Sequence, residues 1–240
     1  MSEEQGRVSE EPTIDVIIPA FNEVKSIPLV LQDIPDDLVN EVVVVNNRST
    51  DGTEEIARRE GAVVLNENRQ GYGYACLKGI NYLKNRKRQP DIVVFIDADY
   101  SDYPGEMPDV VAPILEDDYD MVIGSRARGE REKGSMMPQQ IFGNWLATRL
   151  IRLFYNVTFT DLGPFRAIKF QKLLDLDMQD TTFGWTVEMQ IKAIKNKLKF
   201  TEVPVSYRKR VGVSKIAGTL SGSVKAGYKI IYTILKYTLK

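Results

Sequence analysis

The apolar run at residues 92–96 (Ile-Val-Val-Phe-Ile) constrains the fold of this chain more than any other segment. Consecutive apolar residues rich in β-branched side chains predict a strand buried on both faces, which is typical of parallel sheets. Asp97 and Asp99 follow this run directly, at the carboxyl end of the strand, where open α/β sheets bind ligands. Their hard oxygen donors suit Mg²⁺ or Mn²⁺ beside a phosphate group. The alternative interpretation is an acidic turn that caps the next helix.

Composition excludes several classes of protein. The 240 residues include 43% hydrophobic and 27% charged residues, as in an ordinary soluble globular protein. A net charge of −1 argues against a general nucleic-acid binder. The chain has no histidine, which excludes Ser-His-Asp and Cys-His nucleophilic schemes and imidazole acid–base catalysis.

The residues predict no targeting to a compartment other than the cytoplasm. A single cysteine, Cys76, cannot form an internal disulfide, and its helical surroundings predict a buried small hydrophobe. The first twelve residues are polar and acidic, and we expect a disordered lead over 1–12 rather than a signal peptide. No window supplies the roughly 20 apolar residues of a membrane span. We therefore expect a cytoplasmic protein whose contact with the cytoplasmic face of a membrane is peripheral.

The first half of the chain alternates strands with helices. Strands are predicted at 14–18, 41–45, 62–65, 92–96 and 121–123, and helices around 29–34, after Asp51, at 74–84 and at 106–115. Asp51 followed by Glu54 predicts a capping box at the second of these helices. This alternation predicts right-handed crossovers, hence a mostly parallel sheet with helices on both faces in a single α/β domain.

The second half extends this domain. Residues 125–140 combine Gly, Ser, Pro and mixed charge, and predict a mobile loop. Helices are predicted at 141–155, 186–196 and 224–239, and a strand at 199–207. Lys225, Lys229, Lys236 and Lys240 fall near one face of the last helix, so it either lies on anionic lipid or covers the core.

Four further segments carry polar or glycine-rich turns. Segment 16–23 (Val-Ile-Ile-Pro-Ala-Phe-Asn-Glu) and segment 46–53 (Asn-Asn-Arg-Ser-Thr-Asp-Gly-Thr) are strand ends that run into turns. Each turn could instead serve only to cap a helix. In 69–73 (Arg-Gln-Gly-Tyr-Gly), the glycines would let a backbone approach a phosphate at a helix N-terminus. Segment 207–215 supplies cations that could grip a pyrophosphate, although a solvated basic loop is the alternative.

Together these segments resemble glycosyltransferase family 2, with its nucleotide-sugar-binding, Rossmann-like GT-A fold. The motifs that carry the resemblance are those at 16–23, Ser-Thr-Asp-Gly-Thr at 49–53, and the Asp97, Asp99 pair. The second half looks closest to the polyprenyl-phosphate and dolichyl-phosphate branch. Its carrying residues are Asp-Leu-Gly-Pro-Phe-Arg at 161–166, Glu-Val-Pro-Val at 202–205, and Arg210 with Gly-Val-Ser-Lys at 212–215.

The resemblance implies a GT-A domain over 13–215, with a donor half at about 13–124 and an acceptor half at about 125–215. Residues 216–240 form the C-terminal amphipathic helix. The family resemblance also implies that Asp97 and Asp99 hold Mg²⁺ or Mn²⁺ on the donor diphosphate. It implies further that Asn46 lies against the nucleobase, and that Arg210 and Lys215 close over the phosphates. Asp97 could instead serve the ribose or a metal-bound water.

The predicted site residues fall into three sets. Those expected to contact the nucleotide-sugar donor are Pro19, Ala20, Asn22, Glu23, Asn46, Ser49, Asp51, Gly71, Asp97 and Ala98. Those expected on the acceptor side are Arg126, Asp161, Arg166 and Ser214; Asp161 could instead be a buried partner of Arg166. Those expected to act in catalysis are Asp99, Arg210, Lys215 and Glu188.

The predicted reaction is the metal-dependent transfer of a sugar, with inversion, from a UDP-glucose-like or GDP-mannose-like donor to a polyprenyl phosphate. A lipid phosphate is already an anion and needs no strong base. A hydroxyl acceptor would need a carboxylate base, for which Glu188 is the candidate, unless Glu188 merely bridges near the start of its helix. The alternative of another class is a non-catalytic nucleotide-sugar-binding protein.

The chain departs from the family pattern at three places. Asn46 and Asn47 stand where an acidic pair is usual, and Arg48 stands where glycine is frequent. Tyr100 also replaces a frequent glycine, which predicts a narrower or more aromatic mouth of the donor pocket.

Overall fold

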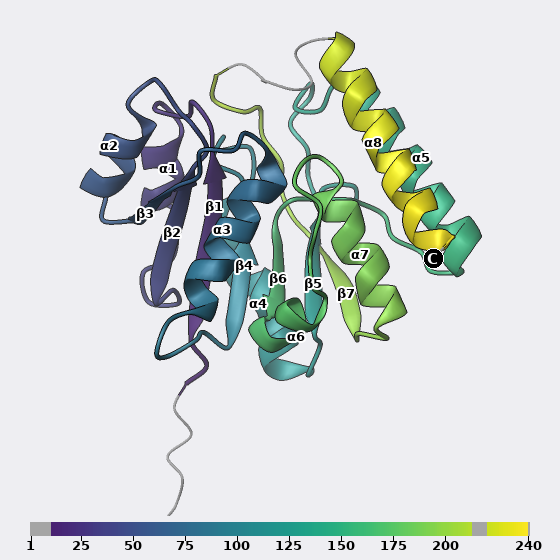
Figure 1. Cartoon of the computed structure of the whole chain (residues 1–240), viewed down its shortest axis with the longest axis horizontal. Helices are drawn as coiled ribbons and strands as arrows, with labels where there is room; N and C mark the ends of the chain where they lie inside the picture. The colour runs from purple at the N-terminus through teal and green to yellow at the C-terminus, as the bar shows by residue number, and fades with distance from the viewer. Residues whose placement is uncertain (1–10, 213–219, 240) are drawn as a thin grey trace, which may run out of the picture.

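The computed structural model describes residues 11–212 and 220–239, which build a seven-stranded sheet in the order β3-β2-β1-β4-β6-β5-β7 (Figure 1). The strands are β1 (Ile14–Ala20), β2 (Glu41–Asn46), β3 (Val63–Asn66), β4 (Ile92–Phe95), β5 (Met121–Ser125), β6 (Arg166–Lys169) and β7 (Phe200–Pro204). The helices are α1 (Ile27–Gln32), α2 (Thr53–Arg59), α3 (Tyr72–Lys84), a short 3₁₀ turn (Pro104–Glu106), α4 (Met107–Glu116), α5 (Pro138–Tyr155), α6 (Phe170–Asp175), α7 (Trp185–Lys195) and α8 (Leu220–Thr238).

The sheet is mostly parallel, as predicted. Strand β1 pairs in parallel with β2 and with β4, β2 pairs in parallel with β3, and β5 pairs in parallel with β7. Strand β6 runs antiparallel between β4 and β5. Strand β6 and the helix α6 that follows it were not predicted. The four residues of β6 show no clear alternation of apolar and polar side chains.

Helices cover both faces of the sheet, which confirms the predicted α/β architecture. Ile17 and Phe95 face a core that includes Trp185 of α7 and Leu83 of α3. The neighbouring residues of the same strands point to the opposite core, where Ile18 packs with Val110 of α4. Cys76 is buried in the first core, as expected.

The start of α2 differs from the prediction. Gly52, with φ of 87°, is the N-cap residue, and Asp51 stands one position earlier, where its Oδ1 accepts the Thr53 amide at 3.1 Å. The Glu54 carboxylate accepts hydrogen bonds from Arg58 and Asn66. The predicted capping box is therefore wrong, since Glu54 is bound along its own helix and to β3.

The last helix packs against the domain. Helix α8 lies beside α5 (Figure 1), and its Ile234 and Tyr237 belong to the core that contains Trp185. This confirms that one face of α8 covers the core. Across the described ranges 11–212 and 220–239, no helix is both long and apolar enough to span a membrane.

Candidate active site

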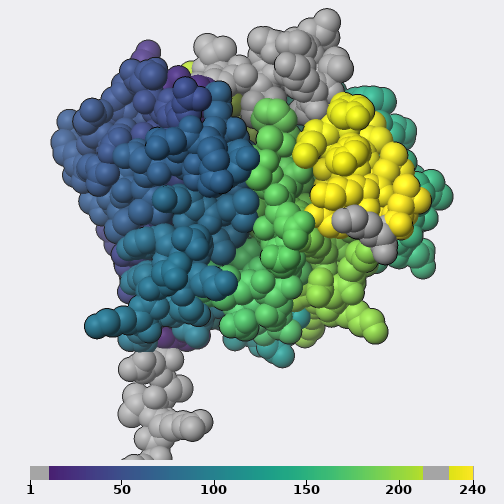
Figure 2. All heavy atoms as spheres, viewed as in Figure 1, coloured from purple at the N-terminus to yellow at the C-terminus, as the bar shows by residue number. Residues whose placement is uncertain are grey.

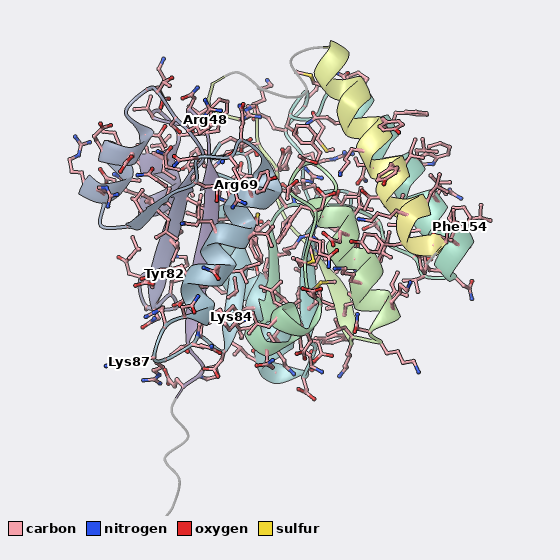
Figure 3. All side chains as sticks on the ribbon, viewed as in Figure 1. Arg48, Arg69, Tyr82, Lys84, Lys87 and Phe154 are labelled. Carbon is pink, nitrogen blue, oxygen red and sulfur yellow. The ribbon has the colours of Figure 1, made fainter. Side chains whose placement is uncertain are left out.

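The polar strand ends predicted from the sequence meet at one edge of the sheet. Ala20 of β1 pairs in register with Asn46 of β2, and Ile17 of β1 pairs with Phe95 of β4. Because these strands are parallel, the turns that follow them leave the sheet on the same side. Figure 3 shows Arg48 and Arg69, from the turns after β2 and β3, near this edge. The edge therefore gathers Glu23, Asn46 and the carboxylate pair.

Asp97 and Asp99 line a cavity of about 300 Å³. The Oδ1 atom of Asp97 is buried and accepts no hydrogen bond from the described residues. Burial, and then the nearby charge of Asp99, raise the pKa of the Asp97 carboxyl above its usual range. A divalent cation would offset both the cost of burying the charge of Asp97 and its repulsion by Asp99, and carboxylate oxygens suit Mg²⁺ or Mn²⁺. Ala98, between them, is buried.

Asp99 is held by the loop that follows it and by a distant arginine. Its Oδ1 accepts the Ser101 amide at 2.9 Å, and its Oδ2 lies 3.2 Å from Nη2 of Arg210. The same Nη2 donates to Oε1 of Glu23 at 2.9 Å. The structure thus brings together three predicted site residues: Glu23 from the turn after β1, Asp99 from the loop after β4, and Arg210 from segment 207–215. No group of three or more His, Cys, Asp or Glu side chains within residues 11–212 and 220–239 could hold a metal alone, so donor oxygens or water would complete the coordination of Asp97 and Asp99.

The described part of segment 207–215, which we call the basic segment, lies along the loop after β4 that carries Asp97 and Asp99. The Val211 amide donates to the Asp99 carbonyl at 3.0 Å, and the Arg208 amide donates to the Ser101 carbonyl at 2.9 Å. Ser214 and Lys215, also predicted in this segment, lie outside the described residues.

Tyr100 does not line the cavity that contains Asp97 and Asp99, so the predicted aromatic mouth is not found there. Its φ of 61° explains why glycine suits this position. The ring turns away from the cavity: its hydroxyl donates to Asp33 at 2.5 Å, and the Arg208 guanidinium lies 3.3 Å from the ring centroid. Arg208 also contacts the ring of Tyr103 at 4.0 Å, so it clamps the loop after β4.

The turns after β1 and β2 are tied to each other. The Asn22 amide donates to Ser49 Oγ at 2.9 Å, and Oδ1 of Asn22 accepts the Thr50 amide at 2.8 Å. Asp51 Oδ2 accepts the Val24 amide at 3.2 Å. These predicted donor contacts, Asn22, Ser49 and Asp51, therefore shape the edge, whereas Pro19 and Ala20 belong to β1 itself.

The side-chain amide of Asn46 is largely used within the protein. Its Nδ2 donates to Oδ1 of Asn66 at 2.8 Å and to Oε2 of Glu54 at 3.3 Å, while its Oδ1 accepts the Ser49 amide at 3.0 Å. Both of its N–H groups are thus engaged, which leaves one carbonyl lone pair for a base. Asn47, which is not among the predicted site residues, fixes the next turn by accepting the Gly71 amide at 2.7 Å.

The glycines at 71 and 73 serve the protein's own packing. A Cβ on Gly71 would lie 2.4 Å from the Thr181 carbonyl oxygen, and one on Gly73 would lie 2.0 Å from the Asp180 carbonyl oxygen. The Tyr74 amide donates to the Thr181 carbonyl at 3.1 Å. The expectation that Gly71 makes room for a phosphate is therefore wrong, because the backbone at 180–181 occupies that space.

Arg126 and Asp161 form a buried pair on the other wall of the cavity. The Arg126 guanidinium donates through Nε at 2.8 Å and Nη2 at 2.7 Å to the two carboxylate oxygens of Asp161. Burial raises the pKa of Asp161, but the charge and hydrogen bonds of Arg126 outweigh it and lower that pKa overall. Arg126 lines the cavity and lies 5.0 Å from the centroid of the Tyr207 ring.

Arg166 does not reach the cavity. It is fully buried, and its guanidinium donates to the backbone carbonyls of Gly163, Leu162 and Thr186. Burial lowers its pKa to about 10. Its predicted contact with an acceptor, and its predicted pairing with Asp161, are both corrected: Arg166 supports the turn before β6.

Glu188 is also turned away from the cavity. It is fully buried, and its oxygens accept the amides of Gln179 at 3.0 Å and Asp180 at 2.6 Å and the hydroxyl of Tyr237 at 2.5 Å. Lys192 Nζ lies 2.9 Å from Oε1. Of the two interpretations, the bridging one fits this geometry, because Glu188 fastens α8 to α7 and cannot meet a substrate.

One buried carboxylate near the site was not predicted. Asp102 is buried, and neither of its oxygens accepts a hydrogen bond from the described residues. Burial, with the charges of Asp97 and Asp99, raises its pKa well above the usual range. Its backbone bridges to Tyr207. The sequence signal that could have identified Asp102 is its position three residues after Asp99.

Comparisons with known proteins agree with this architecture. A sequence model of glycosyl transferase family 2 matches residues 15–176. An uncharacterized glycosyltransferase of Mycobacterium tuberculosis is 34% identical over 215 residues, which cover 89% of this chain and 94% of the relative. A dolichyl-phosphate hexose transferase of Haloferax volcanii is 31% identical over 229 residues, covering 94% and 95% of the two chains. An undecaprenyl-phosphate mannosyltransferase of Micrococcus luteus is 28% identical over 218 residues, covering 86% and 88%.

A solved structure shares the fold. Glucosyl-3-phosphoglycerate synthase from Mycobacterium tuberculosis, crystallised with Mn²⁺, uridine-diphosphate-glucose and phosphoglyceric acid, superposes with a TM-score of 0.76. The match covers 95% of this chain and 80% of that chain at 23% identity, which shows a common fold.

Proposed function

The chain belongs to glycosyl transferase family 2, and we propose that it transfers one sugar, with inversion, from a nucleotide diphosphate sugar to a polyprenyl phosphate. The observation that carries this proposal is the meeting of Asp97, Asp99 and Arg210 at one wall of the cavity. Two acidic groups and a cation side by side match a donor diphosphate that is bound together with a metal.

Asp97 and Asp99 are the residues that would hold Mg²⁺ or Mn²⁺. When bound, the cation supplies charge neutralisation for the leaving diphosphate. Arg210 adds a fixed positive charge 3.2 Å from Asp99, and its buried Nε has no hydrogen-bond partner among the described residues. That N–H is therefore available to a phosphate oxygen, and we assign the same task to Lys215. Electrostatic stabilisation of this kind is usually the largest catalytic contribution.

A lipid phosphate suits the acceptor side of the cavity. Arg126 contributes a guanidinium to this wall, and two of its nitrogens, Nε and Nη2, donate to its carboxylate partner Asp161. A phosphate acceptor arrives ionised and needs no strong base, which agrees with a chain without histidine. A hydroxyl acceptor is less well supported, because Glu188 is bonded away from the cavity. The named relatives from Haloferax volcanii and Micrococcus luteus support the same choice.

The test is a donor and acceptor panel. The full chain is incubated with UDP- or GDP-linked radiolabelled sugars, Mg²⁺ or Mn²⁺, and undecaprenyl or dolichyl phosphate dispersed in detergent. We expect an organic-phase product with one pair, its loss with a chelator, and its return on adding metal. Inversion is read from the anomeric proton by NMR. Donor binding without transfer to any acceptor would contradict the proposal and favour a non-catalytic nucleotide-sugar-binding protein. Transfer only to hydroxyl acceptors would favour a glycosyltransferase that acts on a hydroxyl group.

A further inference from the structure

Exposed aromatic and apolar side chains gather on α5 and α8, which lie side by side at one edge of the molecule (Figure 2). We call this surface the aromatic edge and define it by Phe142, Trp145, Leu153, Phe154, Tyr228 and Tyr232. Phe142 exposes 60% of its surface, Leu153 74% and Tyr228 71%. Figure 3 shows Phe154 pointing outward from this edge. Contiguous exposed apolar surface of this kind marks an interaction site.

The aromatic edge is basic although the chain as a whole is slightly acidic. Neither α5 nor α8 contains an Asp or Glu, and exposed Arg149 and Arg152 lie on α5. Arg149 lies 5.9 Å from the centroid of the Trp145 ring, so a cation and an exposed aromatic ring share this surface. On α8, Lys229 is paired with Asp180 at 2.9 Å, and Lys236 is half-buried. Helices that carry cations and no acidic residue of their own favour an anionic partner.

The same two helices form part of the cavity wall. Gly143 and Asn144 of α5 and Gly227 and Ile230 of α8 line the cavity that also contains Asp97 and Arg126. A partner that covers the aromatic edge therefore lies next to the cavity.

We propose that the aromatic edge lies on an anionic lipid bilayer, with the cavity opening beside the headgroups. Trp and Tyr prefer the interface between hydrocarbon and water, and nearby Arg and Lys attract anionic lipids. A second copy of the chain fits less well, because a twofold contact would bring Arg149 and Arg152 of both copies together. The biological purpose of this docking rests on the proposed lipid phosphate acceptor, but its test does not.

Trp145 provides a direct probe. The chain has two tryptophans, of which Trp145 is 51% exposed and Trp185 1% exposed. With vesicles of phosphatidylglycerol and brominated phosphatidylcholine, free of polyprenyl phosphate and of donor, we expect quenching of tryptophan emission and flotation of the full chain. The variant W145F should lose the quenching and still float.

Variants of the aromatic edge then test the surface. F142S with L153S should weaken binding roughly tenfold or more, and R149Q should weaken binding to anionic vesicles roughly fivefold. L115S, on an exposed residue of α4, is the matched control and should bind like the wild type. All these positions are exposed, so circular dichroism should report an unchanged fold.

Absence of wild-type binding, or binding that F142S with L153S leaves unchanged, would overturn the proposal. So would a concentration-dependent dimer that this double variant abolishes, because the partner would then be a second copy. Sugar transfer to a detergent-dispersed acceptor is measured separately, so failure of docking and failure of the proposed reaction are distinguishable.

Discussion

Nη2 of Arg210 lies 3.2 Å from Oδ2 of Asp99, although 111 positions separate the two residues in the chain. Glu23 holds the same nitrogen from the opposite side at 2.9 Å. Beside this pair, Asp97 Oδ1 and Arg210 Nε are buried without hydrogen-bond partners among the described residues. A buried carboxylate oxygen and a buried guanidinium N–H that lack hydrogen-bond partners are each costly in a resting protein, so their presence here points to a bound ligand that satisfies both atoms.

Removal of the Asp99 carboxylate should abolish sugar transfer and leave the fold intact. In D99A, Arg210 keeps Glu23 as a partner, so the loop after β4 retains one of its ties. We expect turnover to fall by at least roughly 10²-fold, together with the stabilisation that Mn²⁺ and nucleotide confer on the wild type in thermal-shift assays. D118N, at an exposed carboxylate, is the control and should keep both. Wild-type turnover in D99A would refute the metal assignment.

Substitution of Glu188 should affect stability more than chemistry. E188Q leaves Lys192 without its 2.9 Å partner and weakens the bond from Tyr237 of α8. Breaking a buried ion pair typically costs about 3–5 kcal/mol, which chemical denaturation would measure. Below its lowered unfolding temperature, we expect E188Q to retain most of its turnover. If E188Q were inactive with the unfolding temperature of the wild type, Glu188 would be a catalytic base after all; E55Q, at an exposed position of α2, is the control.

The carboxyl ends of the strands were predictable because they follow from local pattern. Residues 92–96 read as a buried strand, and parallel strands end at a shared edge, so the convergence of Asp97 with Asn46 and Glu23 needed no knowledge of side-chain packing. Strand β6 was not predictable in this way, since its pairing depends on two distant strands rather than on its own four residues.

The sequence could not predict which groups of the folded chain contact one another. Asp161 lies five residues from Arg166, yet it binds Arg126, 35 positions away, because the turn at 162–163 directs Arg166 toward backbone carbonyls. The glycine pattern at 71–73 correctly indicated a close backbone approach. It did not indicate that Thr181 of the same chain, rather than a phosphate, makes that approach.

Addition of a methyl group at Gly73 should therefore destabilise the protein. In G73A the new Cβ would stand 2.0 Å from the Asp180 carbonyl oxygen, so backbone must move. Overpacking of this kind costs about 1–3 kcal/mol, and each kcal/mol lowers the unfolding temperature by about 2–4 °C in a chain of this size. G143A is a matched control inside α5, where nothing lies within 4 Å of the added Cβ. That variant should be unchanged or gain about 0.5–1 kcal/mol, and equal unfolding temperatures for the two variants would contradict the packing argument.

The Glu67 carboxylate should stabilise the turn after β3 only while it is ionised. Its oxygens accept Nε and Nη2 of Arg69, each at 2.9 Å, and the Arg69 amide at 2.8 Å. These hydrogen bonds, chiefly those from the Arg69 side chain, lower the pKa of Glu67 from 4.5 to about 2. The stabilisation is therefore complete above pH 4.5 and is lost as the pH falls through about 2. Because the Arg69 side chain is 66% exposed, we expect E67Q to lose about 1 kcal/mol or less of unfolding free energy at pH 7.

Urea unfolding at pH 7 and at pH 3 measures the difference in unfolding free energy between wild type and E67Q. This difference should shrink at the lower pH, whereas E116Q, on the surface of α4, should show no difference from the wild type at either pH. A difference that grows on acidification would mean that the neutral carboxyl, not the ion, makes the stabilising contacts.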